Sequence, residues 1–196
     1  MTSSGTLASN ADSQLTTYTP DALGRTVRID YPDETYVTYA FDAAGRQTRM
    51  VDSTGTTDYG YDDANRQTSV SYPTGKSLTY GYDAVGNRLT LVDSTAGPTT
   101  YGYDAVNLLT SIANPFGETT TITHDELNRE ATKTLANGVV TTHTYDAAGR
   151  ETELKHVSGS TVLADFVSTY DAVGNRLTMS EVVSGQDDAE NLWTYD

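Results

Sequence analysis

The sequence predicts an all-β protein built as an array of β-hairpins. A short phrase centred on an aspartate recurs along the 196 residues at intervals of 20 to 25 residues. Apolar residues beside each copy alternate with polar ones at period two, which is typical of half-buried strands. Periods of this length indicate repeats that bury their apolar faces only by stacking on neighbouring repeats.

Each copy of the phrase predicts a tight turn. An aspartate begins it, and the third residue after the aspartate is always Gly or Asn, the types that tolerate a positive φ. This pattern favours a type I turn closed by a bulge, in which the carboxylate accepts hydrogen bonds from the backbone N–H groups ahead of it. The predicted turn residues are Asp21, Gly24, Asp42, Gly45, Asp62, Asn65, Asp83, Gly86, Asp104, Asn107, Asp125, Asn128, Asp146, Gly149, Asp171 and Gly174.

Aromatic residues precede most of these turns, often as pairs two positions apart. Since residues i and i+2 of a strand share a face, the pairs predict a ladder of rings on one side of the sheet. We expect this ladder to serve as the core, and a role of the rings in stacking on sugars is the alternative. Its members are Tyr39, Phe41, Tyr59, Tyr61, Tyr80, Tyr82, Tyr101, Tyr103, His143, Tyr145, Tyr170, Trp193 and Tyr195.

A second turn, rich in Pro, Gly, Asn and Ser, closes each repeat, so that each repeat is one hairpin of about 21 residues. The hairpins are expected to form one long antiparallel sheet, curled or spiralling. Residues 1–14 read as a flexible lead, and residues 15–196 as eight repeats and a truncated ninth. Because the last residues, 192–196, repeat only the first strand of a hairpin, we expect a fragment or a subunit of something larger.

Composition narrows the class of partner. The formal net charge is −15 with only 12 Lys and Arg residues, so the surface should repel nucleic acid and sulfated glycans. Aliphatic residues are few, and we expect the rings of the 14 tyrosines to supply the apolar surface that a core needs. The chain has no cysteine, no apolar stretch long enough to insert into a membrane and no signal-peptide pattern at its start.

Residues suited to chemistry are present but show no catalytic spacing. His124 and His143 take positions of the aromatic columns, and His156 lies in the following strand, which favours structural roles for all three. We therefore predict no catalytic, cofactor-binding or metal-binding residues. Calcium held by Asp62-Asp63, or by Asp187-Asp188 with Glu190, is the alternative, although neither segment has an EF-hand or nonapeptide spacing.

The phrase Tyr-Asp-Ala-Val-Gly-Asn-Arg-Leu-Thr stands at residues 82–90 and again at 170–178. It resembles the YD-repeat (Rhs) family, as do residues 145–150 and 41–46, and the resemblance extends from about Tyr18 to Asp196. The family includes bacterial Rhs toxins, the shell-forming components of insecticidal toxin complexes, and teneurins. The resemblance implies a sheet that contributes to a hollow shell. The family's self-cleaving segment has no counterpart here, since the sequence contains no Asp-Pro pair.

Two functions remain open from the sequence. In the first, the array is a non-catalytic segment of a shell or scaffold that encloses or presents a polypeptide cargo. In the second, it is an extracellular adhesion or filament-forming module, which recognises a partner through exposed aromatics such as Trp193 and Phe116 or assembles end to end through open strand edges. The expected partners are other YD repeats, copies of the chain, or a cargo. A secreted or cell-surface location is implied by the resemblance.

Overall fold

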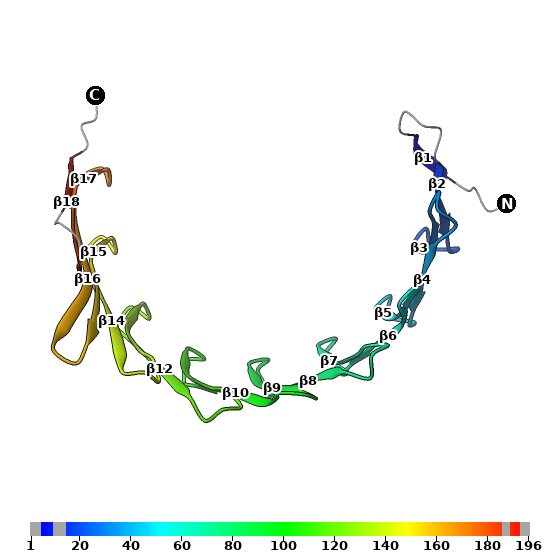
Figure 1. The fold of residues 1–196 in the computed structure, drawn as a ribbon, viewed down its shortest axis with the longest axis horizontal. Helices are drawn as coiled ribbons and strands as arrows, with labels where there is room; N and C mark the ends of the chain where they lie inside the picture. The colour runs from blue at the N-terminus through cyan, green and yellow to red at the C-terminus, as the bar shows by residue number, and fades with distance from the viewer. Residues whose placement is uncertain (1–4, 10–14, 186–188, 193–196) are drawn as a thin grey trace. The chain divides into compact units, whose positions relative to one another are not determined.

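All regular structure in the described part of the chain is β-strand. The computed structural model describes residues 5–9, 15–185 and 189–192. Two compact units divide the chain, residues 1–98 and 99–196. Within each unit the strands form a single layer in which consecutive strands lie side by side (Figure 1). The predicted all-β class is confirmed.

The first unit consists of antiparallel strands that each pair with the next strand in sequence. Its strands are β1 (Gly5–Ser9), β2 (Leu15–Pro20), β3 (Thr26–Asp30), β4 (Tyr36–Phe41), β5 (Gln47–Asp52), β6 (Gly55–Tyr61), β7 (Gln67–Ser71), β8 (Ser77–Tyr82) and β9 (Arg88–Asp93). Residues 5–9 of the expected lead thus form a strand. The boundary at residue 14 stays a prediction.

The second unit repeats the same arrangement, and its first strand begins two residues before the unit boundary. Antiparallel pairing again follows sequence order. Its strands are β10 (Gly97–Tyr103), β11 (Leu109–Ala113), β12 (Thr119–His124), β13 (Glu130–Thr134), β14 (Val139–Tyr145), β15 (Glu151–Ser158), β16 (Thr161–Tyr170), β17 (Arg176–Val183) and β18 (Ala189–Leu192). The predicted sheet of antiparallel hairpins is confirmed.

The register gives the two faces of the sheet different chemistry, because directly paired residues share a face. In β3 to β9 one face is apolar and tyrosine-rich, and we name it the tyrosine face. It comprises Ile29, Val37, Tyr39, Met50, Thr57, Tyr59, Val70, Leu78, Tyr80 and Leu91. The opposite side, the polar face, comprises Arg28, Asp30, Tyr36, Thr38, Ala40, Arg49, Val51, Thr56, Asp58, Gly60, Ser69, Ser71, Ser77, Thr79, Gly81, Thr90 and Val92.

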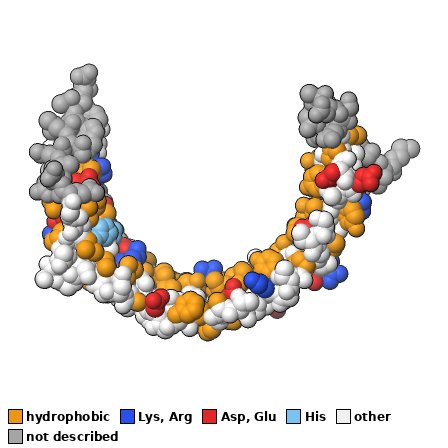
Figure 2. Space-filling model, in the orientation of Figure 1, with side chains coloured by type: hydrophobic (Ala, Val, Ile, Leu, Met, Phe, Trp, Pro, Cys, Tyr) orange, Lys and Arg blue, Asp and Glu red, His pale blue; other side chains and the backbone are white. Residues whose placement is uncertain are grey.

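The corresponding face of the second unit differs in its charged and titratable groups. Lys133, His143 and His156 lie on it together with Ile122 and Leu154. Seen from one side, hydrophobic side chains in both units lie between acidic and basic ones (Figure 2).

Burial is limited in this single layer. The buried apolar residues are Val70 and Ile122, and no large side chain is fully buried among the described residues. Every buried residue, the polar Thr57, Thr141 and Ser168 included, belongs to the face that carries the tyrosines or to its counterpart in the second unit. The ladder rings from Tyr39 to Tyr170 are half-buried rather than enclosed, because no second layer covers them in the described part of the chain.

Candidate functional site

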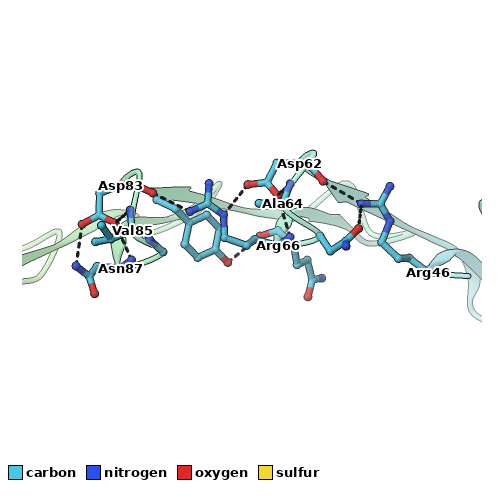
Figure 3. Close-up of polar contacts among 11 residues, drawn as sticks. Arg46, Asp62, Ala64, Arg66, Asp83, Val85 and Asn87 are labelled. Atoms are coloured by element: carbon cyan, nitrogen blue, oxygen red, sulfur yellow. Dashed lines mark hydrogen bonds and ion pairs between the residues drawn. The ribbon is translucent and has the colours of Figure 1, made fainter. Parts of the chain in front are cut away.

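The most elaborate polar structure in the chain is the aspartate turn and its link to the next turn. In the turn at Asp62, the Oδ1 atom of the carboxylate accepts hydrogen bonds of 2.9 Å from the backbone N–H groups of Ala64 and Arg66. The Asn65 N–H donates to the Asp62 carbonyl oxygen at 3.1 Å, and Asn65 has a φ of 63°. The aspartate side chain therefore holds the turn closed from inside (Figure 3).

All eight Gly or Asn residues at the equivalent position have a positive φ. Next to these turns the strand register shifts by one residue, for example between Gly60 and Tyr61 and between Gly81 and Tyr82. A left-handed residue followed by such a shift is the geometry of a type I turn closed by a bulge.

An arginine four residues after the aspartate joins one turn to the next. Arg66 donates from Nε to the Oδ2 atom of Asp62 at 2.7 Å, and from Nη1 to the backbone carbonyl oxygen of Asp83 at 2.7 Å. Its guanidinium carbon lies 4.8 Å from the centre of the Tyr82 ring. A planar guanidinium can make all three contacts at once, because its N–H groups point outward in the plane while its face covers the ring. Figure 3 shows Arg66 between the two turns.

The tyrosine before the Asp83 turn returns the contact. The Tyr82 hydroxyl donates to the backbone carbonyl oxygen of Gln67 at 2.9 Å, in the strand that begins just after Arg66. Arginine and tyrosine thus connect two successive repeats in opposite directions. We call this set of contacts the arginine–tyrosine link.

The ring contact and the tyrosine hydrogen bond of the link recur in both units, while the Nη1 atom of Arg129 has no hydrogen-bond partner among the described residues. Arg46 and Tyr61, Arg129 and Tyr145, and Arg150 and Tyr170 have guanidinium-to-ring distances of 4.9, 4.2 and 4.9 Å. The three tyrosine hydroxyls donate to the carbonyl oxygens of Gln47, Glu130 and Glu151 at 2.9, 3.0 and 2.8 Å. Arg25 lies 4.6 Å from the centre of the Phe41 ring, where no hydroxyl is present.

Three repeats have another residue in place of this arginine. Asn87 and Asn175 donate from Nδ2 to the Oδ2 atoms of Asp83 and Asp171 at 2.8 and 2.9 Å, so that a neutral amide replaces the ion pair. Leu108, at the third position, carries no group that could pair with a carboxylate. The aspartate turn is therefore retained where the residue four positions after the aspartate is not arginine.

The carboxylates of the turns that carry the link arginine are stabilised in their ionised form. The backbone N–H of Arg46, followed by its guanidinium, lowers the pKa of Asp42 below its ordinary value. The Arg25 guanidinium, as the largest cause, likewise lowers the pKa of Asp21. Hydrogen bonds to a carboxylate favour the charged form, and here they outweigh the opposing effect of desolvation. These groups are structural acceptors with their lone pairs already engaged.

The described rings of the predicted ladder make contacts other than stacking of ring on ring along the sheet. The tyrosine ring of the next repeat is covered by the guanidinium group of a link arginine. Stacking of one ring on another is shown for His143 and Tyr145, whose centroids are 6.3 Å apart. Burial, as the largest cause, raises the pKa of both Tyr59 and Tyr80. Trp193 and Tyr195 lie outside the described residues, as does the truncated ninth turn.

The three histidines make different contacts. His143 contacts two glutamates, with Nδ1 2.6 Å from an Oε1 atom of Glu151 and Nε2 3.4 Å from one of Glu130. The Nδ1 atom of His156 lies 2.9 Å from the Thr141 hydroxyl.

The structure does not gather the acidic residues proposed for calcium. Asp62 is engaged by Arg66, and Asp63 is exposed on the same turn. Asp187-Asp188 and the side chain of Glu190 lie outside the described residues. Across residues 15–185, no three His, Asp or Glu side chains are grouped so that they could hold a metal ion. In the same part of the chain, no helix is suited to cross a membrane.

The sequence prediction did not include the link arginines Arg25, Arg46, Arg66, Arg129 and Arg150. Their recurrence four residues after the aspartate is visible in the sequence. What the sequence does not reveal is that three of these side chains reach a turn 16 to 21 residues further along the chain: Arg46 reaches Asp62, Arg66 reaches Asp83 and Arg150 reaches Asp171.

Comparison with known proteins agrees with this repeat geometry. The RHS Repeat family model matches six overlapping segments, residues 21–57, 41–77, 61–99, 82–119, 103–138 and 124–161. No curated protein sequence matches the chain.

Solved structures of the TcdB2-TccC3 proteins have a similar fold. The crystal structure of TcdB2-TccC3-TEV matches 95% of this chain with a TM-score of 0.63 and 16% identity, and that of TcdB2-TccC3 matches 92% with a TM-score of 0.61 and 16% identity. In both cases the match covers 13% of the solved chain. The family matches extend continuously from residue 21 to residue 161, and the turns within them have one common geometry. The chain belongs to the RHS repeat family.

Proposed function

We propose that this chain is a segment of the wall of a shell or scaffold, and that the complete wall encloses or carries a polypeptide cargo. The observation that supports it is the fold shared with TcdB2-TccC3 over nearly the whole chain. Shell-forming components of insecticidal toxin complexes are members of the family that the motifs resemble. The location that fits this role is outside the producing cell.

The wall itself performs no chemistry in this proposal. Its repeated polar groups serve the fold, since the turn aspartates accept bonds from their own turns and the link arginines bind the next turn. A wall needs units that join without interruption, and the link supplies such a joint between the repeats that carry it.

Negative-stain electron microscopy of the purified chain, combined with a protease assay, tests the proposal. Curved wall segments are expected, together with slower digestion of an added unfolded polypeptide such as reduced, carboxymethylated lactalbumin. Straight filaments without protection of the polypeptide would contradict the proposal. They would favour an adhesion or filament-forming module that assembles through open strand edges.

A further inference from the structure

The chain exposes more surface than a folded monomer of its mass normally does. Its accessible surface is 12751 Å² for 21.1 kDa, whereas a compact monomer of that mass exposes about 9,000 Å². The difference, on the order of 3,700 Å², is larger than the roughly 1,200–2,000 Å² that a stable protein interface buries in total. The surface available is thus sufficient for a partner to cover one face of the sheet.

The tyrosine face of the first unit is the side with the character of a core. It carries the buried Val70 and Thr57, while Tyr39, Tyr59 and Tyr80 remain half-buried beside them. Its charged side chains, Asp52, Lys76 and Asp93, lie at the margin next to the second turns, and the residues between the two margins are uncharged. In a protein of net charge −15, an uncharged surface is where two copies can meet without repulsion.

The carboxylates at the margins of this face are already engaged. At one margin the link arginines pair with their turn aspartates, as Arg66 does with Asp62. At the other margin Asp52 and Asp93 accept hydrogen bonds from the N–H and hydroxyl groups of Thr54 and Thr95. A second layer placed on the tyrosine face would therefore leave no carboxylate without a partner at these positions.

A hollow on the same face has an exposed ring at its rim. It has a volume of about 420 Å³ and is lined by Met50, Tyr59, Tyr72 and Lys76, among others. Tyr72 is 42% exposed. Two copies related by a two-fold axis each present both features, so that the Tyr72 ring of one copy can enter the hollow of the other.

We infer that the tyrosine face of the first unit is an interaction surface whose partner is the same face of a second copy of this chain. The two sheets pack face to face, about 10 Å apart, as the sheets of a β-sandwich do. Burial of half-exposed tyrosines drives the association. This inference goes beyond the proposed wall, because it concerns pairing through a sheet face and not the content of a shell.

Sedimentation velocity of the full chain, over as wide a concentration range as solubility allows, tests the pairing. A species of twice the monomer mass is expected. Tyr72→Asp should raise its dissociation constant by about tenfold or more, because it places a charge in an apolar contact. Tyr36→Asp is the matched control. Tyr36 is 43% exposed and also lies beside a turn, but on the polar face, so the dissociation constant should not change.

Thermal melts establish whether both variants are folded. If Tyr72→Asp does not fold, Tyr72→Ser replaces it, because this change removes the ring without adding a charge. A chain that stays monomeric at its highest concentration would overturn the inference. Equal weakening by the Tyr72 and Tyr36 variants would also overturn it. A monomer that binds only the unfolded polypeptide would show that the face is covered by another kind of chain, and that result would contradict the pairing while leaving the proposed wall intact.

Discussion

At the scale of single residues, backbone conformation is the best-predicted property of this chain. The Gly or Asn in each aspartate turn can be assigned to positive φ from residue type alone, because other side chains clash with the backbone there. Glu34, with a φ of 66°, could not have been assigned in the same way. Its side chain type gives no sign of the conformation, which is imposed by the hairpin between β3 and β4.

Gly174→Val should lower the stability of the chain by more than about 1–2 kcal/mol, since a β-branched residue tolerates positive φ worse than others do. Gly174 has a φ of 99°, and a Cβ atom there would meet no other atom within 4 Å. The loss would therefore come from backbone strain and not from a clash. Denaturant unfolding measures it. Asn65→Gly, at an equivalent φ, is the control and should be nearly neutral, and parent-like stability of Gly174→Val would refute the account.

Arg66→Lys should lower the melting temperature although it keeps the charge. Lysine has no planar guanidinium group with several N–H donors, so it cannot bind Asp62 and the Asp83 carbonyl oxygen while covering the Tyr82 ring. Arg49→Lys is the control, because Arg49 forms an exposed pair with Asp58 on the polar face. Calorimetry of both variants compares them, and an equal effect would mean that the link contributes no more than a surface ion pair.

Tyr82→Phe should reduce stability by about 0.5–1.5 kcal/mol, the usual net contribution of one hydrogen bond. The change removes the donor to the Gln67 carbonyl oxygen and keeps the ring under Arg66. Phe41 already occupies the equivalent position under Arg25, which indicates that the ring alone is accommodated. Denaturant unfolding would detect the loss. Full retention of stability would mean that water replaces the tyrosine as donor.

At the scale of hairpins and turns, the sequence predicts the strands and turns but not the side-chain contacts that join neighbouring repeats. Alternation and turn residues place the strands, because they depend on a few adjacent positions. The arginine–tyrosine link depends on which carbonyl oxygen lies within reach of Arg66 after the sheet has formed. The same limit applies to the rings. That the rings share a face can be predicted from the sequence. That guanidinium groups lie over them cannot, because this contact depends on how successive turns pack.

The aspartate turns should make the chain sensitive to acid. Because the pKa of Asp42 and Asp146 is lower in the folded chain than in the unfolded one, their stabilisation is fully present above the ordinary pKa of aspartate. It is lost as the pH falls through the lowered, folded-state pKa. The melting temperature should therefore fall as the pH drops from about 5 to about 2. Melts of the Asp42→Asn variant should show a shallower fall, and an identical profile would contradict the assignment.

At the scale of the whole molecule, the sequence predicts the class and the repeat, but not the division into two units. The repeat pattern continues across residue 98, so no change in composition marks the boundary. Within each unit the contacts between strands connect consecutive strands. Stability should thus be a sum over neighbouring hairpins and not the property of one central core.

Val70→Ala tests this locality. Val70 is 5% exposed, and its truncation should cost about 2 kcal/mol from lost burial and the cavity left behind. Hydrogen exchange should become faster in β6, β7 and β8 and stay unchanged in β15 to β17, because those strands share no contact with Val70. A uniform loss of protection along the chain would show instead that the array unfolds as one cooperative body.

The arginine–tyrosine link also bears on how such arrays can lengthen in evolution. A repeat that carries both Tyr61 and Arg66 offers a tyrosine backward and an arginine forward, so a tandem duplication of that whole period supplies both halves of the new joint. A duplication with endpoints out of phase would instead leave a guanidinium without its carbonyl acceptor and a ring without its cover. Gene duplications in phase with the repeat are therefore the ones that selection should retain. Copy number can then change while the chemistry of each joint stays the same.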